Sequence, residues 1–323
     1  MSSTGLKIKD FSKIKLHDLR IGGIFPVDIY VSLKLNDSIV LYKKKGEAVN
    51  RETFEKLTQI KEGCLLILKA DLFPFQSHQG SQKLSKALGT GGQIDSKLAK
   101  ESADELLNLA ANDLNPDQNS KDILNNLTEM VEKIITDLKH SPVIANYSTL
   151  LNQVADRTDV LSNHGRQVSA LSVLFLMSLG KASLDEILDI GTAGLAHDLA
   201  LVQLPQVIIE KHLSRSHEWN DAEKLLHMKH ADLTIDLLKK RKISSNPSVF
   251  RTIEHHHENW DGSGFKGLIG NSIFRLARIL RIADDAVIEL NLSEQKSGLA
   301  EILKKFQMEL GKKRICPCLI LKY

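Results

Sequence analysis

The 323-residue chain is poor in cysteine, in aromatic residues and in net charge. Its three cysteines, two of them in "CPC" near the C-terminus, make no disulfide framework, so we expect a cytoplasmic protein. The "CPC" is read as a tail feature in preference to a soft-metal site. The net charge of +3 gives no argument for nucleic acid or an anionic membrane as a partner. Aromatic residues make up only 5%, which favours helix over sheet.

Long apolar runs and a recognisable signal peptide are also missing. The densest apolar stretch, "ALSVLFLMSL" at 170–179, is far shorter than the roughly 20 residues of a membrane-spanning helix. The chain is 42% hydrophobic and 26% charged, which is typical of a globular protein with a sizeable core. We therefore expect one or two folded domains that are not embedded in a membrane.

The first 75 residues have the alternation of strands. "IFPVDIYVSLKL" and "NDSIVLYKKKGE" predict two strands joined by a turn, "RETFEKLTQI" a helix, and "GCLLILKA" a buried strand. The lysines of "YKKKGE" are interpreted as protection of an edge strand, with a phosphate-binding patch as the alternative. Residues 76–93 are rich in Gln, Ser and Gly and predict a linker or loop. Helical periodicity returns at 96–113 and 121–139, separated by a turn at "NPDQNS".

From about residue 145 onward the pattern is almost entirely helical. The fold class is therefore mainly α, with a smaller α+β N-terminal domain. We place that domain at 1–145 and assign it a regulatory or sensing role, and we place an all-helical domain at 146–310. Capping signals mark several helix starts, among them "SLDE" at Ser183, Asn220 with Glu223, and Asn246 before Pro247.

The helical half concentrates the side chains that bind metals. Nine of the twelve histidines lie between His164 and His257. Five helices each bring an imidazole or a carboxylate onto or beside their apolar stripes, whereas His255 faces the other way. The residues so placed are His164, His197, Asp198, His230, His256, His257 and Asp284.

A single histidine on an apolar face is usually a hydrogen-bonded core residue, but seven such groups together are different. A buried aspartate is costly unless it is paired or bound to a metal. Imidazoles with carboxylates suit Fe, Mn or Zn, and the set exceeds one tetrahedral zinc site, which indicates two metals. His256 and His257 project roughly 100° apart on a helix, so they can serve two neighbouring ions.

The order and spacing of these motifs resemble those of an HD-GYP domain. The matching elements are "HD" at 197–198, the isolated His230, "HHENWDGSGF" at 256–265 and "LARILRIAD" ending at Asp284. HD-GYP domains form the branch of the HD phosphohydrolase superfamily that hydrolyses cyclic di-GMP in bacterial signalling. The resemblance implies an all-helical domain around a binuclear or trinuclear centre. Val160 replaces the glutamate of trimetal members, so we expect two divalent ions, Fe or Mn.

The resemblance also implies roles. Asp198 would bridge the two ions, and His197 beside it would be the other member of the catalytic pair. His164 would complete the coordination shell of one ion. Two metals about 3.5–4 Å apart activate a bridging water as hydroxide for in-line attack on a phosphodiester. The substrate would be cyclic di-GMP or a related nucleotide phosphodiester. Candidate substrate contacts are Trp260, Asp261, Gly262, Gly264, Phe265, Lys266 and Arg278.

Three departures from the family pattern concern substrate contact. Leu201 stands where a phosphate-contacting lysine is expected, and Phe265 and Lys266 replace the tyrosine and proline of "GYP". The basic-aromatic segment after the last aspartate is replaced by "DAVIELNLSEQ". One alternative is therefore a weak or inactive signalling module that keeps its metals and binds a nucleotide or a protein partner. A third hypothesis is a nucleotidase acting on phosphomonoesters.

Overall fold

The chain divides into two compact units, Met1–Gly80 with Asp113–Gln118 and Ser81–Asn112 with Asn119–Tyr323. The computed structural model describes residues 7–310 except 20, 34–37, 60–64, 90–93, 112–119, 138–148, 151, 153–159, 217, 243–245 and 293–298. The three cysteines, residues 115–119 of the "NPDQNS" turn and the C-terminal tail lie outside the described residues, and Ser120 begins a helix. The predicted mainly α class with a small N-terminal sheet is confirmed.

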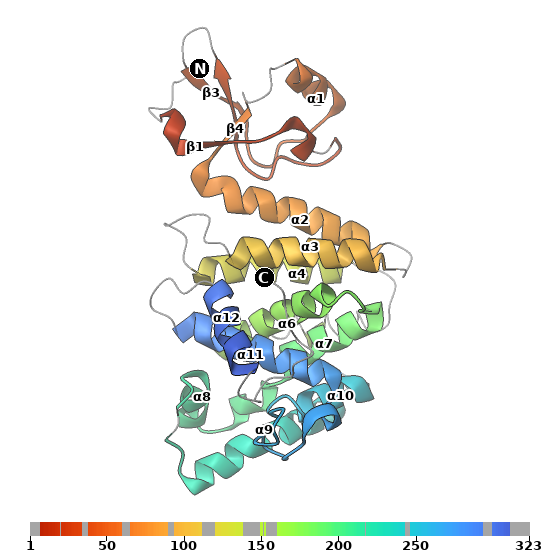
Figure 1. The fold of residues 1–323 in the computed structure, drawn as a ribbon, viewed down its shortest axis with the longest axis vertical. Helices are drawn as coiled ribbons and strands as arrows, with labels where there is room; N and C mark the ends of the chain where they lie inside the picture. Colours follow the sequence, from red (N-terminus) through yellow and green to blue (C-terminus); the bar gives the residue numbers. More distant parts are fainter. Residues whose placement is uncertain are drawn as a thin grey trace. The chain divides into compact units, whose positions relative to one another are not determined.

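The first unit is built on a four-stranded antiparallel sheet in its described part, in the order β1-β4-β2-β3 (Figure 1). Tyr30 pairs with Leu41 on one side and with Leu66 on the other. β3 is the edge strand, as the lysines predict, and Lys43 there pairs with Glu47 at 2.9 Å. The elements are η1 (Ile8–Asp10), β1 (Phe11–Lys13), η2 (Leu16–Asp18), β2 (Ile29–Leu33), β3 (Ser38–Lys43), α1 (Arg51–Thr58), β4 (Leu65–Leu68) and η3 (Lys69–Asp71).

The predicted linker at 76–93 was wrong for its larger part. Helix α2 (Leu72–Leu88) continues through it as far as residue 88, and 90–93 lie outside the described residues. The buried positions keep helical spacing from Phe73 to Leu84 and Leu88. Ser77 and Gly80 fill two positions of this stripe and are themselves buried. Because a hydroxyl and a missing side chain interrupt the apolar pattern, the stripe does not stand out in the sequence.

The second unit is helical throughout its described part, and no helix there or elsewhere in the described residues is long and apolar enough to cross a membrane. Its elements are α3 (Ser96–Ala111), α4 (Ser120–Thr136), α6 (Val160–Ser178), α7 (Leu184–Ala196), η4 (Leu199–Gln203), α8 (Gln206–Leu213), α9 (Asp221–Lys240), α10 (Pro247–Glu254), η5 (Gly270–Ser272), α11 (Arg275–Leu292) and α12 (Leu299–Leu310).

Helix α6 is the central helix of this unit. It packs against α3, α4, α7 and α11, and almost every side chain from position 161 to 178 is buried (Figure 1). A helix that is apolar on nearly all sides needs such a shell of neighbours. Arg166 on α6 pairs with Glu132 on α4 through two contacts of 2.7 and 2.6 Å. Helices α3 and α4, which the sequence analysis assigned to the N-terminal domain, therefore pack with the helical unit.

A glycine contact sets the distance between α6 and α7. A Cβ atom on Gly194 would lie 2.6 Å from the Cα atom of Ser169, and one on Gly165 would lie 2.9 Å from the carbonyl oxygen of Leu195. Real side chains do not tolerate such approaches, so the two backbones can meet only through glycine. Gly165 follows His164 and Gly194 precedes His197 by one turn. The close crossing therefore brings these two histidines to one place.

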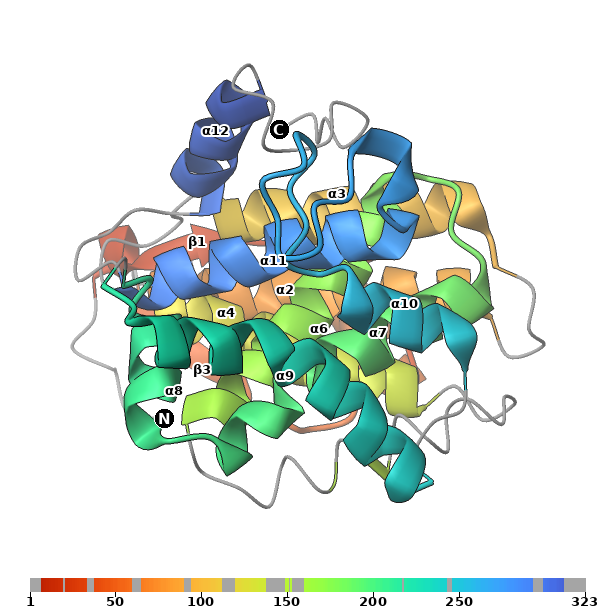
Figure 2. The same ribbon diagram turned by 90° about the horizontal axis from the view of Figure 1, so that it is seen from below.

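Helix starts follow the predicted caps. Ser183 and Glu186 form a capping box on α7, as Asn220 and Glu223 do on α9. Asn246 caps α10 before Pro247 at its first turn. Figure 2 shows α8 beside the first half of α9, and the pair Lys211–Glu223 joins the two helices at 2.6 Å. Helix α8 was not expected from the sequence, and it contributes to the site described next.

Candidate metal centre

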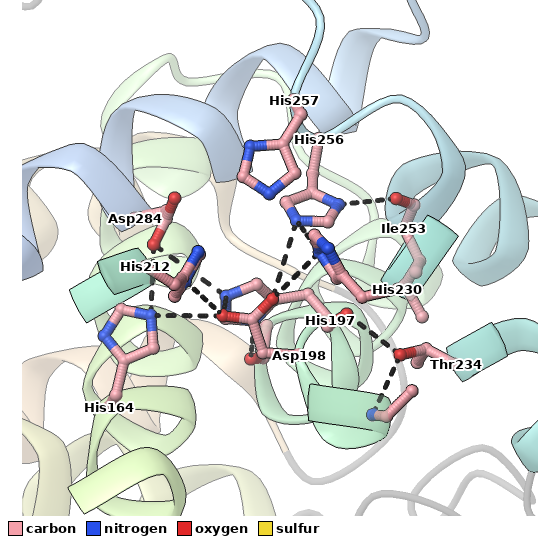
Figure 3. Close-up of polar contacts among 12 residues, drawn as sticks. His164, His197, Asp198, His212, His230, Thr234, Ile253, His256, His257 and Asp284 are labelled. Atoms are coloured by element: carbon pink, nitrogen blue, oxygen red, sulfur yellow. Dashed lines mark hydrogen bonds and ion pairs between the residues drawn. The ribbon is translucent and has the colours of Figure 1, made fainter. Parts of the chain in front are cut away.

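All seven side chains expected to bind metal converge on one buried point in the helical unit. Figure 3 shows Asp198 in the middle, with imidazoles around it. No one of the seven exposes more than 8% of its surface. They lie on α6, α9 and α11, at the two positions after α7, and at the second and third positions after α10: His164, His230, Asp284, His197, Asp198, His256 and His257.

The carboxylate of Asp198 divides the histidines into two groups. Its Oδ1 lies 3.1 Å from Nε2 of His230 and 3.8 Å from Nε2 of His256. Its Oδ2 lies 3.2 Å from Nε2 of His197 and 3.8 Å from Nε2 of His164. Each oxygen of a single carboxylate thus faces its own set of imidazoles.

Asp284 belongs to the Oδ2 side. Its Oδ1 lies 3.0 Å from Nε2 of His164 and 3.8 Å from Nε2 of His197. Two atoms bound to one ion at about 2.0–2.2 Å lie about 2.8–3.4 Å apart. The shortest spacings on both sides of Asp198 fall in this range.

Backbone carbonyls set the tautomer of three of the imidazoles. Nδ1 of His197 contacts the carbonyl oxygen of Gly194 at 2.8 Å, and Nδ1 of His256 contacts that of Ile253 at 2.6 Å. Nδ1 of His230 meets the carbonyl oxygen of His227 in the same way. A carbonyl can only accept, so each Nδ1 carries a proton, and Nε2 is the atom that each ring turns toward Asp198.

Thr234 on α9 holds the "HD" turn in place. Its Oγ1 donates to the carbonyl oxygen of His197 at 3.2 Å and accepts from the N–H of Ala200 at 3.1 Å. Both contacts are buried. They fix the backbone on either side of Asp198. The position of its carboxylate is therefore set by the backbone as well as by the side-chain rotamer.

The polar atoms of this cluster are buried and contact one another. They include Nε2 of four of the histidines and all four carboxylate oxygens, on His164, His197, His212, His257, Asp198 and Asp284. The imidazole and carboxylate atoms lie 2.7–3.2 Å apart in their closest pairs, which are ion-pair distances and also the distances between ligands of a shared cation. The donor set fits divalent Fe, Mn or Zn.

The electrostatics of the cluster also call for positive charge. Burial acts to raise the pKa of Asp198, but the imidazoles of His197 and His212 outweigh it and hold that pKa well below its usual range. Burial acts to lower the pKa of His197, but Asp198 and then Asp284 raise it to about 9. Two ionised carboxylates therefore sit in a region from which water is excluded, where charges need cations beside them. His197, with its raised pKa, supplies one positive charge, and Arg215 lies 3.8 Å from Asp284. A bound divalent ion would add to these.

Two histidines that the sequence analysis left out belong to this site. Nε2 of His212, at the end of α8, lies 2.7 Å from Oδ2 of Asp198. Nδ1 of His212 lies 3.0 Å from Nε2 of His227, whose ring stacks on Trp219 at 4.4 Å. A weak signal was present, because His212 follows the buried Ile208 by four residues on one helix face.

A pocket of about 200 Å³ opens beside the cluster. Trp219 and Phe265 give it aromatic walls, and the ring of Phe265 stacks on that of His257 at 4.4 Å. Its cationic groups are Lys211, Arg215 and Arg281. The pocket thus combines flat apolar surfaces with positive charge next to the buried imidazoles.

The expected substrate contacts divide into those at the pocket and those away from it. Of the seven, Phe265 lines the pocket. Lys266 is held between Asp232 and Glu254, with its Nζ 2.9 Å from each. The guanidinium of Arg278 lies over the ring of Trp260 at 5.4 Å. A role of Lys266, Arg278 or Trp260 in substrate contact stays a prediction that this pocket does not support.

The remaining three expected contacts shape the loop after α10. Asp261 accepts hydrogen bonds from the N–H and hydroxyl of Ser263 at 3.0 and 2.7 Å. Gly262 has φ +85°, and a Cβ on Gly264 would lie 2.5 Å from the Cα atom of Glu258. Glu258, which the sequence analysis did not single out, is buried and accepts from the N–H groups of 266 and 268, each at 2.7 Å. These residues fold the loop that presents Phe265.

His255 is kept apart from the cluster. It is buried, but its Nδ1 accepts a hydrogen bond from the backbone N–H of Phe274 at 3.1 Å. Leu201 is also turned away from the pocket, because it is fully buried in an apolar cluster with Leu161 and Ile208. The position expected to hold a phosphate-binding lysine is therefore part of the core.

The match to a known protein family agrees with this geometry. A family described as the HD domain matches residues 148–315, just over half of the chain. No curated protein matches it. A solved structure of Bd1817, an HDG"Y"P protein from Bdellovibrio bacteriovorus, is similar at 19% identity over 96% of each chain, with a TM-score of 0.42. On the family match, the chain belongs to the HD domain family of metal-dependent phosphohydrolases.

Proposed function

We propose that this protein is a phosphodiesterase of the HD-GYP type that hydrolyses cyclic di-GMP or a related nucleotide phosphodiester with two divalent ions, Fe or Mn. The ions would be held by the seven predicted ligands. His164, His197 and Asp284 would serve one side of Asp198. His230, His256 and His257 would serve the other side.

The observation that carries this proposal is the position of Asp198. One carboxylate with a separate imidazole set on each oxygen is the arrangement of a bridging ligand, and it favours two ions over one. The grouping of buried ligand atoms supports it, because His164, His197 and Asp284 form one group and Asp198, His230, His256 and His257 form another.

Divalent ions, when bound at such a centre, would supply a hydroxide nucleophile at neutral pH and neutralise charge on phosphoryl oxygens. The rest of the chemistry belongs to the protein side chains. Arg215 and Arg281 line the pocket beside the centre and can bind the phosphate. Both also contact Asp285, which fixes their direction. Trp219 and Phe265 offer flat faces on which a base can stack.

The size of the pocket supports a nucleotide that is only partly enclosed. Its volume of about 200 Å³ is below the roughly 300 Å³ at which typical small-molecule pockets begin. It can hold one phosphate ester with part of its nucleoside. The second half of a cyclic dinucleotide would remain outside, so recognition would rest on one half of the molecule.

A second candidate function is a binding module of low activity. The observation that favours it is the loss of the phosphate-binding position, since Leu201 is buried in the core. In addition, the pocket cation Lys211 is already paired with Glu223 at 2.6 Å. Such a module would keep the metal centre and bind a nucleotide or a protein partner without turning it over.

The test is hydrolysis of cyclic di-GMP by protein loaded anaerobically with Fe(II) or Mn(II), with bound metal counted in the same sample. About two ions per chain together with linear product supports the phosphodiesterase. A metal-filled sample that leaves the dinucleotide intact favours the binding module. Turnover of a phosphomonoester alone would move the assignment to a nucleotidase.

Two arginines on α11 sharpen the test, because they lie three residues apart. Arg281 lines the pocket and Arg278 does not. If Arg281 binds phosphate, replacing it by Met should raise KM about 10-fold or more, the value of a hydrogen bond to a charged group. Replacing Arg278 by Met should change KM less. The opposite order would contradict the pocket as the substrate site.

A further inference from the structure

His212 lies as close to the centre as any of the seven expected ligands. Its Nε2 is 2.7 Å from Oδ2 of Asp198, and the residue is 4% exposed. His212 also lies near His164. The ligand atoms of His164, Asp198 and His212 all lie within 4.8 Å of one another. It therefore faces the side of Asp198 that also carries His197 and Asp284.

His212 and Asp198 make a buried contact at the distance of an ion pair, with Nε2 of His212 lying 2.7 Å from Oδ2 of Asp198. Two ligands of one ion at a right angle lie about 2.8 Å apart, so the same two atoms are also placed to share one ion. The same relation holds between Nε2 of His197 and this oxygen, at 3.2 Å.

The other nitrogen of His212 has a partner of the kind that metal-binding histidines use. Nδ1 lies 3.0 Å from Nε2 of His227, and the ring of His227 is stacked on Trp219 with an angle of 11° between the planes. A ligating histidine normally donates its second N–H to an acceptor that fixes the ring. The adjacent pair Lys211–Glu223 ties α8 to α9 at the same level.

We propose that His212 is an additional ligand of the metal centre, on the Oδ2 side of Asp198, and that His227 is its positioning residue. This inference rests on the metal centre of the proposed function. It gives the Oδ2 side five protein ligands: His164, His197, Asp198, His212 and Asp284. The Oδ1 side keeps four, so the two positions differ in how many sites remain for substrate and water.

A competing arrangement uses the same residues differently. Ligand atoms of His212, His227 and His257 also lie within 4.8 Å of one another and would suit a separate ion at the pocket. That arrangement needs Nδ1 of His212 to be unprotonated. In our proposal Nδ1 is protonated and donates to His227. The two arrangements predict different metal counts.

The experiment titrates metal-free full-length protein with Co(II) and follows both calorimetry and visible absorption. Wild type is compared with His212→Gln, His227→Gln and His255→Gln. The last variant is the matched control, since it changes a buried histidine that bonds to the backbone of Phe274 and lies outside the cluster. Circular dichroism of each metal-free variant shows whether it is folded.

We expect wild type to bind two ions. His212→Gln should weaken one of them by at least about 100-fold and change its absorption, because one ligand is lost. His227→Gln should weaken the same ion about 10-fold, and His255→Gln should leave both unchanged. Two ions bound by a folded His212→Gln variant with wild-type affinity and spectrum would overturn the proposal. So would a third ion in wild type that both His212→Gln and His227→Gln remove.

The failure of the proposed function gives a different result. If wild type binds no Co(II), the centre itself is wrong, and the inference falls with it. If wild type binds two ions and His212→Gln weakens one, but loaded protein hydrolyses no nucleotide, the ligand assignment stands and the phosphodiesterase does not.

Discussion

The cores of the two units differ in the polarity of the side chains that they bury. In the first unit Phe25, Ile29 and Ile67 are completely buried in a cluster of apolar side chains that pack on one another. In the second, Asp198, Asp284 and six histidines of the centre are buried among the helices. Burying apolar groups stabilises a fold unconditionally, whereas burying charges costs free energy unless a counter-charge is present. The helical unit also has apolar core residues such as Leu174 and Ile187, but at its centre the free energy of burial depends on counter-charge, which a bound ion would supply.

The largest expected effect is the loss of both ions on replacing Asp198 by Asn. An amide keeps the shape but removes the negative charge that both imidazole sets share. The metal content of purified protein, measured by elemental analysis, should fall from about two ions per chain to none. Asp284→Asn is the matched change, because its carboxylate meets only the Oδ2 side. It should retain one ion, and equal losses in both variants would contradict the bridging role.

Removing the metal should destabilise only the helical unit. An ion present at about 1,000 times its Kd stabilises the state that binds it by about 4 kcal/mol. Hydrogen exchange with and without a chelator should therefore show faster exchange in α6, α7 and α11. The amides of β2 and β4 should exchange unchanged. Protection lost equally from the sheet would refute the contrast between the two cores.

The close approach of α6 and α7 offers a smaller effect of another kind. Gly194→Ala places a methyl group 2.6 Å from the Cα atom of Ser169, and such overpacking costs about 1–3 kcal/mol. Because the helices must separate, His164 and His197 should move apart and bind the ion less tightly. Denaturant unfolding in chelator measures the first effect and Co(II) titration the second. Gly46→Ala serves as a comparison. Nothing lies within 4 Å of a Cβ atom at Gly46, so this variant measures the cost of its positive φ without any steric overlap.

Purely apolar changes should separate stability from metal content. Ile29→Val in the sheet core and Ile187→Val in the helical core each remove one methyl group from a fully buried side chain. Both should cost about 0.5–1.5 kcal/mol in denaturant unfolding. Neither should alter the number of ions bound. A loss of metal in the Ile29→Val protein would show that the two cores are not independent.

The smallest expected effect concerns Glu186 at the start of α7. Burial acts to raise its pKa, but contacts with Arg275 and with the backbone N–H of Ser183 outweigh this and lower it from 4.5. The ionised form therefore stabilises the fold above that pH, and the contribution is lost as pH falls through the lowered pKa. Glu186→Gln should cost less than about 1 kcal/mol at pH 7, since the pair is partly exposed. In chelator, unfolding curves should converge with wild type in acid.

Periodicity was sufficient to predict most of the helical unit and the candidate ligands that lie on its helices. His256 and His257 lie in a turn after the end of α10, so the prediction that they project about 100° apart on a helix was wrong. The stripes of α6, α9 and α11 have clear apolar neighbours around each ligand, so His164, His230 and Asp284 stand out. His212 did not, because α8 has eight residues and no side-chain cap, and its apolar residues are nearly consecutive. The contact between His212 and Asp198 also depends on the path of the loop that connects α8 to α9. A local sequence pattern does not predict that path.

The loop after α10 shows a second limit of the sequence. Its glycines and Asp261 predict a turn, and the turn is present. Which side chains it presents depends on longer contacts. Glu258 draws the loop back onto itself, Lys266 is captured by two carboxylates, and Trp260 packs beside Gly270. Phe265 faces the pocket because these contacts between residues distant in the sequence orient the loop.

The hydrogen bonds that lock three imidazoles to their own backbones also bear on which ion the centre accepts. Because each Nδ1 proton is bonded to a carbonyl three residues earlier, the Nε2 atoms are held in direction by helix geometry. Such a frame cannot rearrange to provide the six to eight oxygen ligands that Ca²⁺ prefers, or the mostly oxygen and water shell of Mg²⁺. We therefore expect this nitrogen-rich and rigid site to prefer transition-metal ions over the far more common hard cations.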